Sequence, residues 1–195
     1  MIKIHRAATA LLIGLAFAWP AAAQADAPSV EPEPALRQKV HEATWPADIA
    51  RLAGSYLRAY PQAQASDAVS AMLERANTAM RALSRNDVRL YRTAFQAPAE
   101  AADAADDVHK AALGDKEAAL RLAHLQQRGD GGVPADVNRY VGWLQFASVL
   151  GNERASYELA LHYRRDNQPA LAATYEARAE ELGYVAPASL DHFRK

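Results

Sequence analysis

The spacing of apolar residues predicts a helix that begins near Pro46 and ends before Pro61. These residues recur at intervals of three and four, which places them on one side of a helix and differs from the alternation that strands require. Proline fits the first helical turn and cannot continue a helix, so the two prolines mark its ends. The stripe comprises Ile49, Leu52, Ala53, Tyr56, Leu57 and Tyr60.

A second stripe predicts a longer helix, and either Ser66 or Asp67 is expected to cap its N-terminus. The apolar residues of this stripe are Val69, Met72, Leu73, Ala76, Met80 and Leu83. A shorter element is expected after Asn86 and Asp87. Its apolar side is expected to contain Val88, Tyr91 and Phe95.

The Ala-rich stretch 97–107 is compatible with a flexible linker or with a helix that Pro98 opens and Gly114 ends. The spacing of its apolar residues favours the helix. They are Ala101, Ala105, Val108 and Ala112. Because no part of the chain after the N-terminal segment shows convincing alternation, we predict an all-α fold.

The N-terminal segment has the pattern of a cleavable export signal. Two basic residues, Lys3 and Arg6, precede the uncharged apolar run 7–18, and Pro20 and three alanines follow. A transmembrane helix needs about 20 apolar residues, which is longer than this run. We therefore expect cleavage before Gln24, with a site after Ala25 as the alternative, and a periplasmic or secreted product.

Composition narrows the classes of function. After cleavage the chain would have 20 basic and 23 acidic residues, a net charge of −3, which disfavours nucleic-acid and anionic-lipid partners. The chain has no cysteine, which excludes disulfides and a lipid-anchored cysteine at the cleavage site. The fold must therefore be stabilised by packing alone. Residues 24–34 contain three prolines without periodicity, so we expect a disordered leader.

Similar residues recur around Gly114, Gly151 and Gly183. Ala118 precedes Ala155 by 37 residues, and Leu122 precedes Leu159 by the same interval. An aromatic residue lies eight positions before each of the last two glycines, and an alanine lies four positions before each. These are Trp143 with Ala147 and Tyr175 with Ala179. We expect each glycine to end a helix in a left-handed conformation, with each aromatic–alanine pair packed against a neighbouring helix.

The segment 116–151 resembles a Sel1-like repeat, a relative of the tetratricopeptide repeat. The matching residues are Ala118, Leu122, Gly129, Gly132, Val133, Pro134, Asp136, Trp143, Ala147 and Gly151. The segment 152–183 resembles a second, degenerate unit in which 164–169 replaces the glycine loop. The first unit departs from the family at Ala123, Gln126 and Tyr140, where Gly, Tyr and Ala are common.

This resemblance implies a right-handed α/α superhelix, a solenoid of helical hairpins, in which about 115–183 is the clear part. We expect four parts: a signal peptide at 1–23, a disordered leader at 24–34, divergent helical hairpins at 35–113, and Sel1-like repeats with a C-terminal cap at 114–195. The resemblance also implies a scaffold or adaptor in a cell-envelope process. The cysteine-rich Sel1-like proteins associated with β-lactams are a poor match, because this chain lacks cysteine.

Candidate chemistry in the sequence is sparse. The loop 129–134 lacks the Lys and Ser/Thr of a phosphate-binding loop and the ligands of a calcium loop, so we expect a turn in which Asp136 caps the next helix. His124, His162 and Glu158 lack an evident further zinc ligand, which favours a Glu–His pair over a metal site. No nucleophile motif is present. We therefore expect neither a cofactor nor an enzyme.

The partner is expected to be another protein or peptide, bound by a monomer or weak oligomer without a membrane anchor after cleavage. The aromatic residues are expected mainly to pack between helices, and one or two exposed ones would serve as anchors. The basic pair Arg164 and Arg165 would suit an acidic peptide. The candidate binding residues are Tyr140, Trp143, Tyr157, Tyr163 and Arg164. The alternatives are a self-assembling structural envelope protein and a cell-wall-directed hydrolase.

Overall fold

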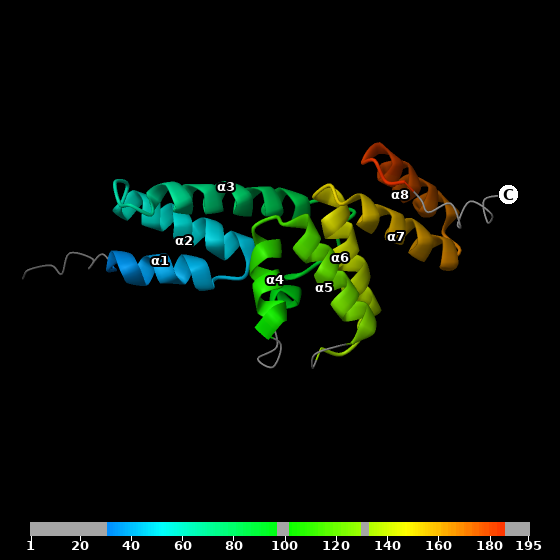
Figure 1. Cartoon of the computed structure of the whole chain (residues 1–195), viewed down its shortest axis with the longest axis horizontal. Helices are drawn as coiled ribbons and strands as arrows, with labels where there is room; N and C mark the ends of the chain where they lie inside the picture. Colours follow the sequence, from blue (N-terminus) through cyan, green and yellow to red (C-terminus); the bar gives the residue numbers. More distant parts are fainter. Residues whose placement is uncertain (1–30, 97–101, 130–132, 186–195) are drawn as a thin grey trace, which may run out of the picture. The chain divides into compact units, whose positions relative to one another are not determined.

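The computed structural model describes residues 31–96, 102–129 and 133–185, and within these ranges the fold is all-α (Figure 1). It contains eight α-helices, one 3₁₀ turn and no strand in the part described. The helices are α1 (Glu33–Glu42), α2 (Pro46–Ala59), α3 (Ser66–Leu83), α4 (Ala102–Ala112), α5 (Lys116–Arg128), α6 (Val137–Val149), α7 (Glu153–Arg165) and α8 (Pro169–Glu181), with the turn η1 (Arg92–Phe95) between α3 and α4.

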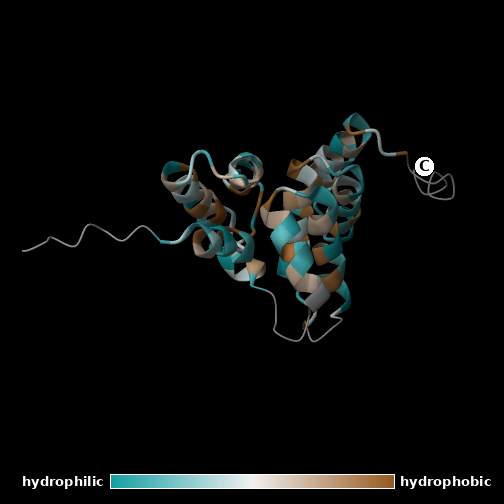
Figure 2. Cartoon of the chain, turned by 60° about the vertical axis from the view of Figure 1, so that its left-hand side comes forward, coloured by the Kyte–Doolittle hydropathy of each residue, from teal (hydrophilic) through white to brown (hydrophobic). Residues whose placement is uncertain are grey.

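The hydrophobic stripes form the buried sides of these helices. In α2, Ile49, Ala53 and Tyr56 are fully buried, and Pro46 occupies the first turn as predicted. Figure 2 shows that the helices carry both hydrophobic and hydrophilic residues, as expected of helices with one buried side. Both stripes are therefore confirmed as helices, but the buried face of α3 differs from the prediction at Met80, which is 38% exposed, while Ala79 and Ala82 are buried.

The ends of the helices follow the predicted turn chemistry. Gly114, Gly151 and Gly183 have positive φ angles of 78°, 93° and 92°, which confirms the left-handed helix stops. The Asp136 carboxylate accepts hydrogen bonds from the backbone N–H groups of Asn138 and Arg139, which confirms it as the cap of α6. These stops and caps make short, defined connections between helices.

Most packing joins helices that follow one another in the chain. Within each of the pairs α2–α3, α5–α6 and α7–α8 the two helices lie against each other, and α4 and α6 pack on α5 and α7 respectively. One core cluster runs through all these elements. Trp143 and Ala147 are fully buried, and Tyr175 and Ala179 are also in the interior, so both aromatic–alanine pairs contact neighbouring helices as expected.

Basic side chains reinforce the helix ends from neighbouring elements. Arg75 Nε on α3 donates to the carbonyl oxygen of Leu113 at 3.2 Å, and Arg178 on α8 donates to that of Ser148 at 3.0 Å. Lys116 Nζ donates to the carbonyl oxygen of Gly151 at 2.9 Å. The final carbonyl groups of a helix lack intrahelical partners, and these bonds bring side-chain donors to carbonyl groups at or just after helix ends; the Ser148 oxygen also accepts from the backbone N–H of Gly151 at 3.0 Å.

Two predictions about helix starts were wrong. Helix α1 begins at Glu33, inside the range assigned to the leader, because Pro32 and Pro34 fit a helix start as well as a disordered segment. Ser66 and Asp67 do not cap α3, which has Ala65 at the cap position without a side-chain bond. The Ser66 hydroxyl instead donates to the carbonyl oxygen of Tyr60 at 2.7 Å.

Two predicted apolar faces also differ from the structure. Tyr91 is 72% exposed; its backbone is extended, with φ −111° and ψ 164°, and it directly precedes the turn η1. In α4, Ala105 is exposed, and the buried side contains Ala104, Val108 and Ala111. The helix interpretation holds from Ala102 onward, whereas the earlier part of 97–107 lies outside the described residues.

The predicted signal peptide and most of the predicted leader, 1–30, also lie outside the described residues. In the ranges that the structure does describe, none of the helices has the length and apolar character needed to cross a membrane.

Candidate functional site: a basic pocket formed by α5, α6 and α7

Three side-chain caps fix the helices that form the site. Asp115 caps α5, Asp136 caps α6 and Asn152 caps α7. The fully buried Asn152 also donates from Nδ2 to Glu117 Oε1 on α5 at 3.0 Å. One residue therefore orients the start of α7 relative to the start of α5.

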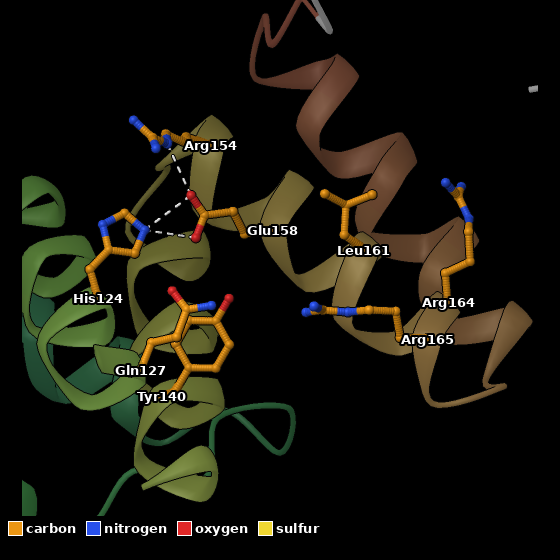
Figure 3. Close-up of a pocket in the computed structure, with 8 residues that line it drawn as sticks. All are labelled: His124, Gln127, Tyr140, Arg154, Glu158, Leu161, Arg164 and Arg165. Atoms are coloured by element: carbon orange, nitrogen blue, oxygen red, sulfur yellow. Dashed lines mark hydrogen bonds and ion pairs between the residues drawn. The ribbon is translucent and has the colours of Figure 1, made fainter. Parts of the chain in front are cut away.

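A pocket of about 490 Å³ opens between these three helices. It presents three arginines, one histidine and a single carboxylate, so its charge is predominantly positive. Its lining residues, shown in Figure 3, are His124, Gln127, Tyr140, Arg154, Glu158, Leu161, Arg164 and Arg165. We call this set the basic pocket.

Glu158 is the centre of a charge cluster at one side of the basic pocket. Its carboxylate lies 2.8 Å from His124 Nε2 on α5 and 2.9 Å from Arg154 Nε one turn earlier on α7 (Figure 3). The carboxylate side chain is only 18% exposed, so burial strengthens these contacts relative to a surface pair. The positive charge of Arg154 is thereby compensated within the pocket.

The predicted Glu–His pair is present, and it is formed by Glu158 and His124. Glu158 pairs with His124 on a different helix, although His162 lies one turn further along the same helix. His162 instead lies 3.3 Å from Asp166 and packs edge-on against the ring of Tyr140. Across the described ranges, no three His, Asp or Glu side chains are grouped so that they could bind a metal ion.

Arg165 is the cation of the basic pocket without a compensating partner. Arg164 lies 2.6 Å from Glu176 on α8, whereas Arg165 makes neither an ion pair nor a side-chain hydrogen bond with any described residue. Figure 3 shows Arg165 extending across the pocket toward Tyr140. Its guanidinium is free to bind an anion at two points, the geometry in which arginine recognises carboxylates and phosphates.

The Tyr140 hydroxyl is a second available donor. It has no hydrogen-bond partner among the residues described, although the side chain is only 5% exposed. Burial raises the pKa of Tyr140 above its usual 10.0, the Glu158 carboxylate raises it further and the Arg165 guanidinium lowers it. The hydroxyl therefore stays protonated at neutral pH and can donate to a bound oxygen.

The arrangement is suited to binding an anion. A neutral hydroxyl donor and an uncompensated guanidinium face the same space, with the amide of Gln127 beside them. An anionic oxygen in this space would gain charge-assisted hydrogen bonds.

The five residues predicted to bind a partner occupy different environments. Tyr140 and Arg164 line the basic pocket. Trp143 is fully buried with its ring centre 4.8 Å from that of Phe95. Tyr157 stacks on Tyr184 at 4.5 Å between ring centres, and Tyr163 stacks on Tyr175 at 5.5 Å. In this structure the last three side chains contribute to packing between elements, and Tyr163 also lines a second pocket together with Tyr91.

Six of the eight lining residues were absent from the five predicted binding residues: His124, Gln127, Arg154, Glu158, Leu161 and Arg165. A signal for four of them existed in the sequence, because Arg154, Glu158, Leu161 and Arg165 are spaced by four, three and four residues and share one face of α7. The contribution of Gln127 depends on how α5 packs beside α7, which no local pattern specifies.

Comparison of the chain with protein families, curated proteins and solved structures found no match in any of the three.

Proposed function

We propose that this protein is an exported adaptor of the Sel1-like type, and that its basic pocket binds an acidic segment of a partner protein in a cell-envelope process. The observation that supports it most directly is the pairing of an uncompensated Arg165 with the unbonded Tyr140 hydroxyl in one pocket. The side chains of a partner that satisfy both groups are Asp and Glu, or a chain-terminal carboxylate.

The repeat proposal has separate support. Gly114 and Gly151 end α4 and α6 in the same left-handed geometry, and Asp115 and Asn152 then cap α5 and α7. From α4 to α8, each helix also packs on the next helix in the chain, as expected of stacked repeats. Stacked repeats of this kind expose grooves that bind peptides and partner helices.

Photo-crosslinking in the native envelope tests the binding site. A photoreactive residue in place of Gln127, in the basic pocket, should capture a defined partner, whereas the same residue at exposed Gln62, next to α2, should not. Mass spectrometry then identifies the crosslinked segment, which we expect to be acidic. Equal capture at both positions would contradict the proposed site.

Charge reversal provides the quantitative test. Arg165→Glu should weaken binding of the captured segment by at least about tenfold, because it removes an attractive charge and adds a repulsive one. Arg58→Glu on α2 makes the same change in charge outside the pocket and is the matched control. An affinity that changes equally in both variants would indicate a general effect of net charge and no specific pocket.

Export has its own test. N-terminal sequencing of the protein recovered from the envelope should give Gln24 as the first residue, or Asp26 if the alternative site is used. Recovery of the uncleaved chain in the cytoplasm would refute this part of the proposal and leave the pocket unaffected.

A further inference from the structure

Large hydrophobic side chains are exposed at six positions of the described chain, and three of the six line one pocket. These three are Tyr91, Val137 and Leu171, which are 72%, 61% and 41% exposed. They come from the segment 88–91 between α3 and η1, from the start of α6 and from the start of α8. The pocket has a volume of about 640 Å³, and we call it the Tyr91 pocket. Exposed apolar side chains that gather around a hollow are typical of recognition sites.

The segment that presents Tyr91 is tied to the helices beneath it. The backbone N–H of Arg89 donates to Gln145 Oε1 at 2.8 Å, and Gln145 Nε2 donates to the Tyr163 hydroxyl at 3.0 Å. Gly142 permits the close approach, since a Cβ there would lie 2.6 Å from the carbonyl oxygen of Arg89. Tyr91 is therefore exposed on a backbone that is bonded to α6 and, through it, to α7, which lowers the entropic cost of using it as an anchor.

The Tyr91 pocket and the basic pocket both adjoin a third hollow. This hollow, of about 620 Å³, shares Val137, His162 and Asp166 with the former and Tyr140 and Arg165 with the latter. The lining thus changes from an uncompensated arginine at one end to exposed apolar side chains at the other. The third hollow has two acidic lining residues: Asp166 is paired with His162, and Asp136 caps α6 and lies 3.6 Å from Arg139.

We propose that the Tyr91 pocket binds a large apolar side chain from the same acidic segment that the basic pocket receives. This inference rests on the proposed function and specifies its ligand as an extended peptide with an acidic residue and, further along, a Leu, Met or aromatic residue. The uncompensated positive charge selects the acidic end, and contact with Tyr91, Val137 and Leu171 removes apolar surface from water at the other end.

Synthetic peptides test the two subsites separately. The probes are fluorescein-labelled peptides in which a Glu pair and one Leu are joined by Gly-Ser spacers of varied length, with versions that replace Glu by Gln or Leu by Ser. We expect one spacer length to bind best. Tyr91→Ala should weaken the peptide with both features by about tenfold and leave the peptide without Leu unchanged, whereas Arg165→Gln should weaken both.

Matched variants keep the result interpretable. Tyr91 is mostly exposed, so its truncation should leave the melting temperature unchanged, and Leu182→Ala truncates another exposed apolar residue outside the three pockets. Equal loss of both peptides on Tyr91→Ala, or equal loss on Leu182→Ala, would overturn the inference. If binding depends on the Leu of the peptide but Arg165→Gln does not alter it, the acidic subsite alone is refuted. If no peptide binds, both the acidic and the apolar subsites are refuted.

Self-association is the other occupant that the experiment can identify. If light scattering shows a dimer and Tyr91→Ala dissociates it, the Tyr91 pocket binds a second copy of the chain. That result would overturn the peptide assignment.

Discussion

Trp143 is the largest fully buried side chain among the described residues, and its indole N–H lacks a hydrogen-bond partner there. Its ring lies against Phe95 and Phe146, with centres 4.8 and 6.1 Å apart. Trp143→Ala should lower the free energy of unfolding by about 3–5 kcal/mol, measured by urea titration. Trp143→Phe should cost clearly less, because it also removes an unsatisfied N–H group.

Equal losses in the two Trp143 variants would show that the indole N–H is satisfied in solution. A loss under about 0.5 kcal/mol for Trp143→Ala would show that the residue does not contribute to packing.

Tyr175 gives the fold a pH dependence in the alkaline range. Burial, with smaller effects of Tyr163 and Asp87, raises the pKa of Tyr175 from 10.0 to about 12. Between these values the unfolded chain releases a proton that the folded chain retains, so stability is full below pH 10 and falls as the pH rises toward 12. Tyr175→Phe keeps the ring and should lose less stability over this interval, measured by thermal melts at successive pH values. Parallel curves for both proteins would contradict this assignment.

Residue spacing predicted more of the core than of the site. Trp143, Ala147, Tyr175 and Ala179 are buried as their spacing indicated, because helical periodicity directly determines which side faces a neighbour. The exposure of Tyr91 could not be predicted, since the path of the segment 88–91 depends on the contacts of Arg89 with Gln145 and Gly142 in a distant part of the chain.

At the scale of elements, glycines have two different roles that substitution should separate. A Cβ on Gly142 in α6 would lie 2.6 Å from the carbonyl oxygen of Arg89, a backbone atom that cannot move without displacing the segment 88–91. Gly142→Ala should therefore destabilise the protein by about 1–3 kcal/mol. In α2 a Cβ on Gly54 would meet only Arg58 at 3.5 Å, and Gly54→Ala should stabilise by about 0.5–1 kcal/mol.

Chemical denaturation of both glycine variants provides the comparison. Destabilisation by Gly54→Ala would indicate a constraint on α2 that its open surroundings do not explain. A neutral Gly142→Ala would mean that the segment 88–91 can move away from α6, which would weaken the case for Tyr91 as a fixed anchor.

Helix boundaries were predictable where chain chemistry alone sets them. Pro46 opens α2, Gly114 and Gly151 stop α4 and α6, and Asp136 caps α6. The start of α3 was not predictable in this way. The Ser66 hydroxyl donates to the carbonyl oxygen of Tyr60 in the preceding turn, so it is not available as a cap. Capping residues compete for several backbone partners, and the outcome depends on the turn geometry.

At the scale of the whole molecule, Phe95 joins the helices on either side of the Ala-rich stretch. Its ring centre lies 5.1 Å from Trp45, which precedes α2, and 4.8 and 6.0 Å from Trp143 and Phe146 on α6. The ring is 1% exposed, and it belongs to the single core cluster. A protein with one continuous core is expected to unfold in one cooperative transition.

Phe95→Ala should separate that transition into two, with α1–α3 losing amide protection at lower urea concentration than α5–α8. The variant should also lose about 3–5 kcal/mol of stability, as truncation of a buried aromatic residue does. Hydrogen exchange measured by mass spectrometry reports the two regions independently. Leu159→Ala, a fully buried truncation in α7 outside the ring cluster, should lower stability without exposing α1–α3 first. If both regions of Phe95→Ala lose protection together, the remaining contacts, such as Arg75 to Leu113, are sufficient to couple them.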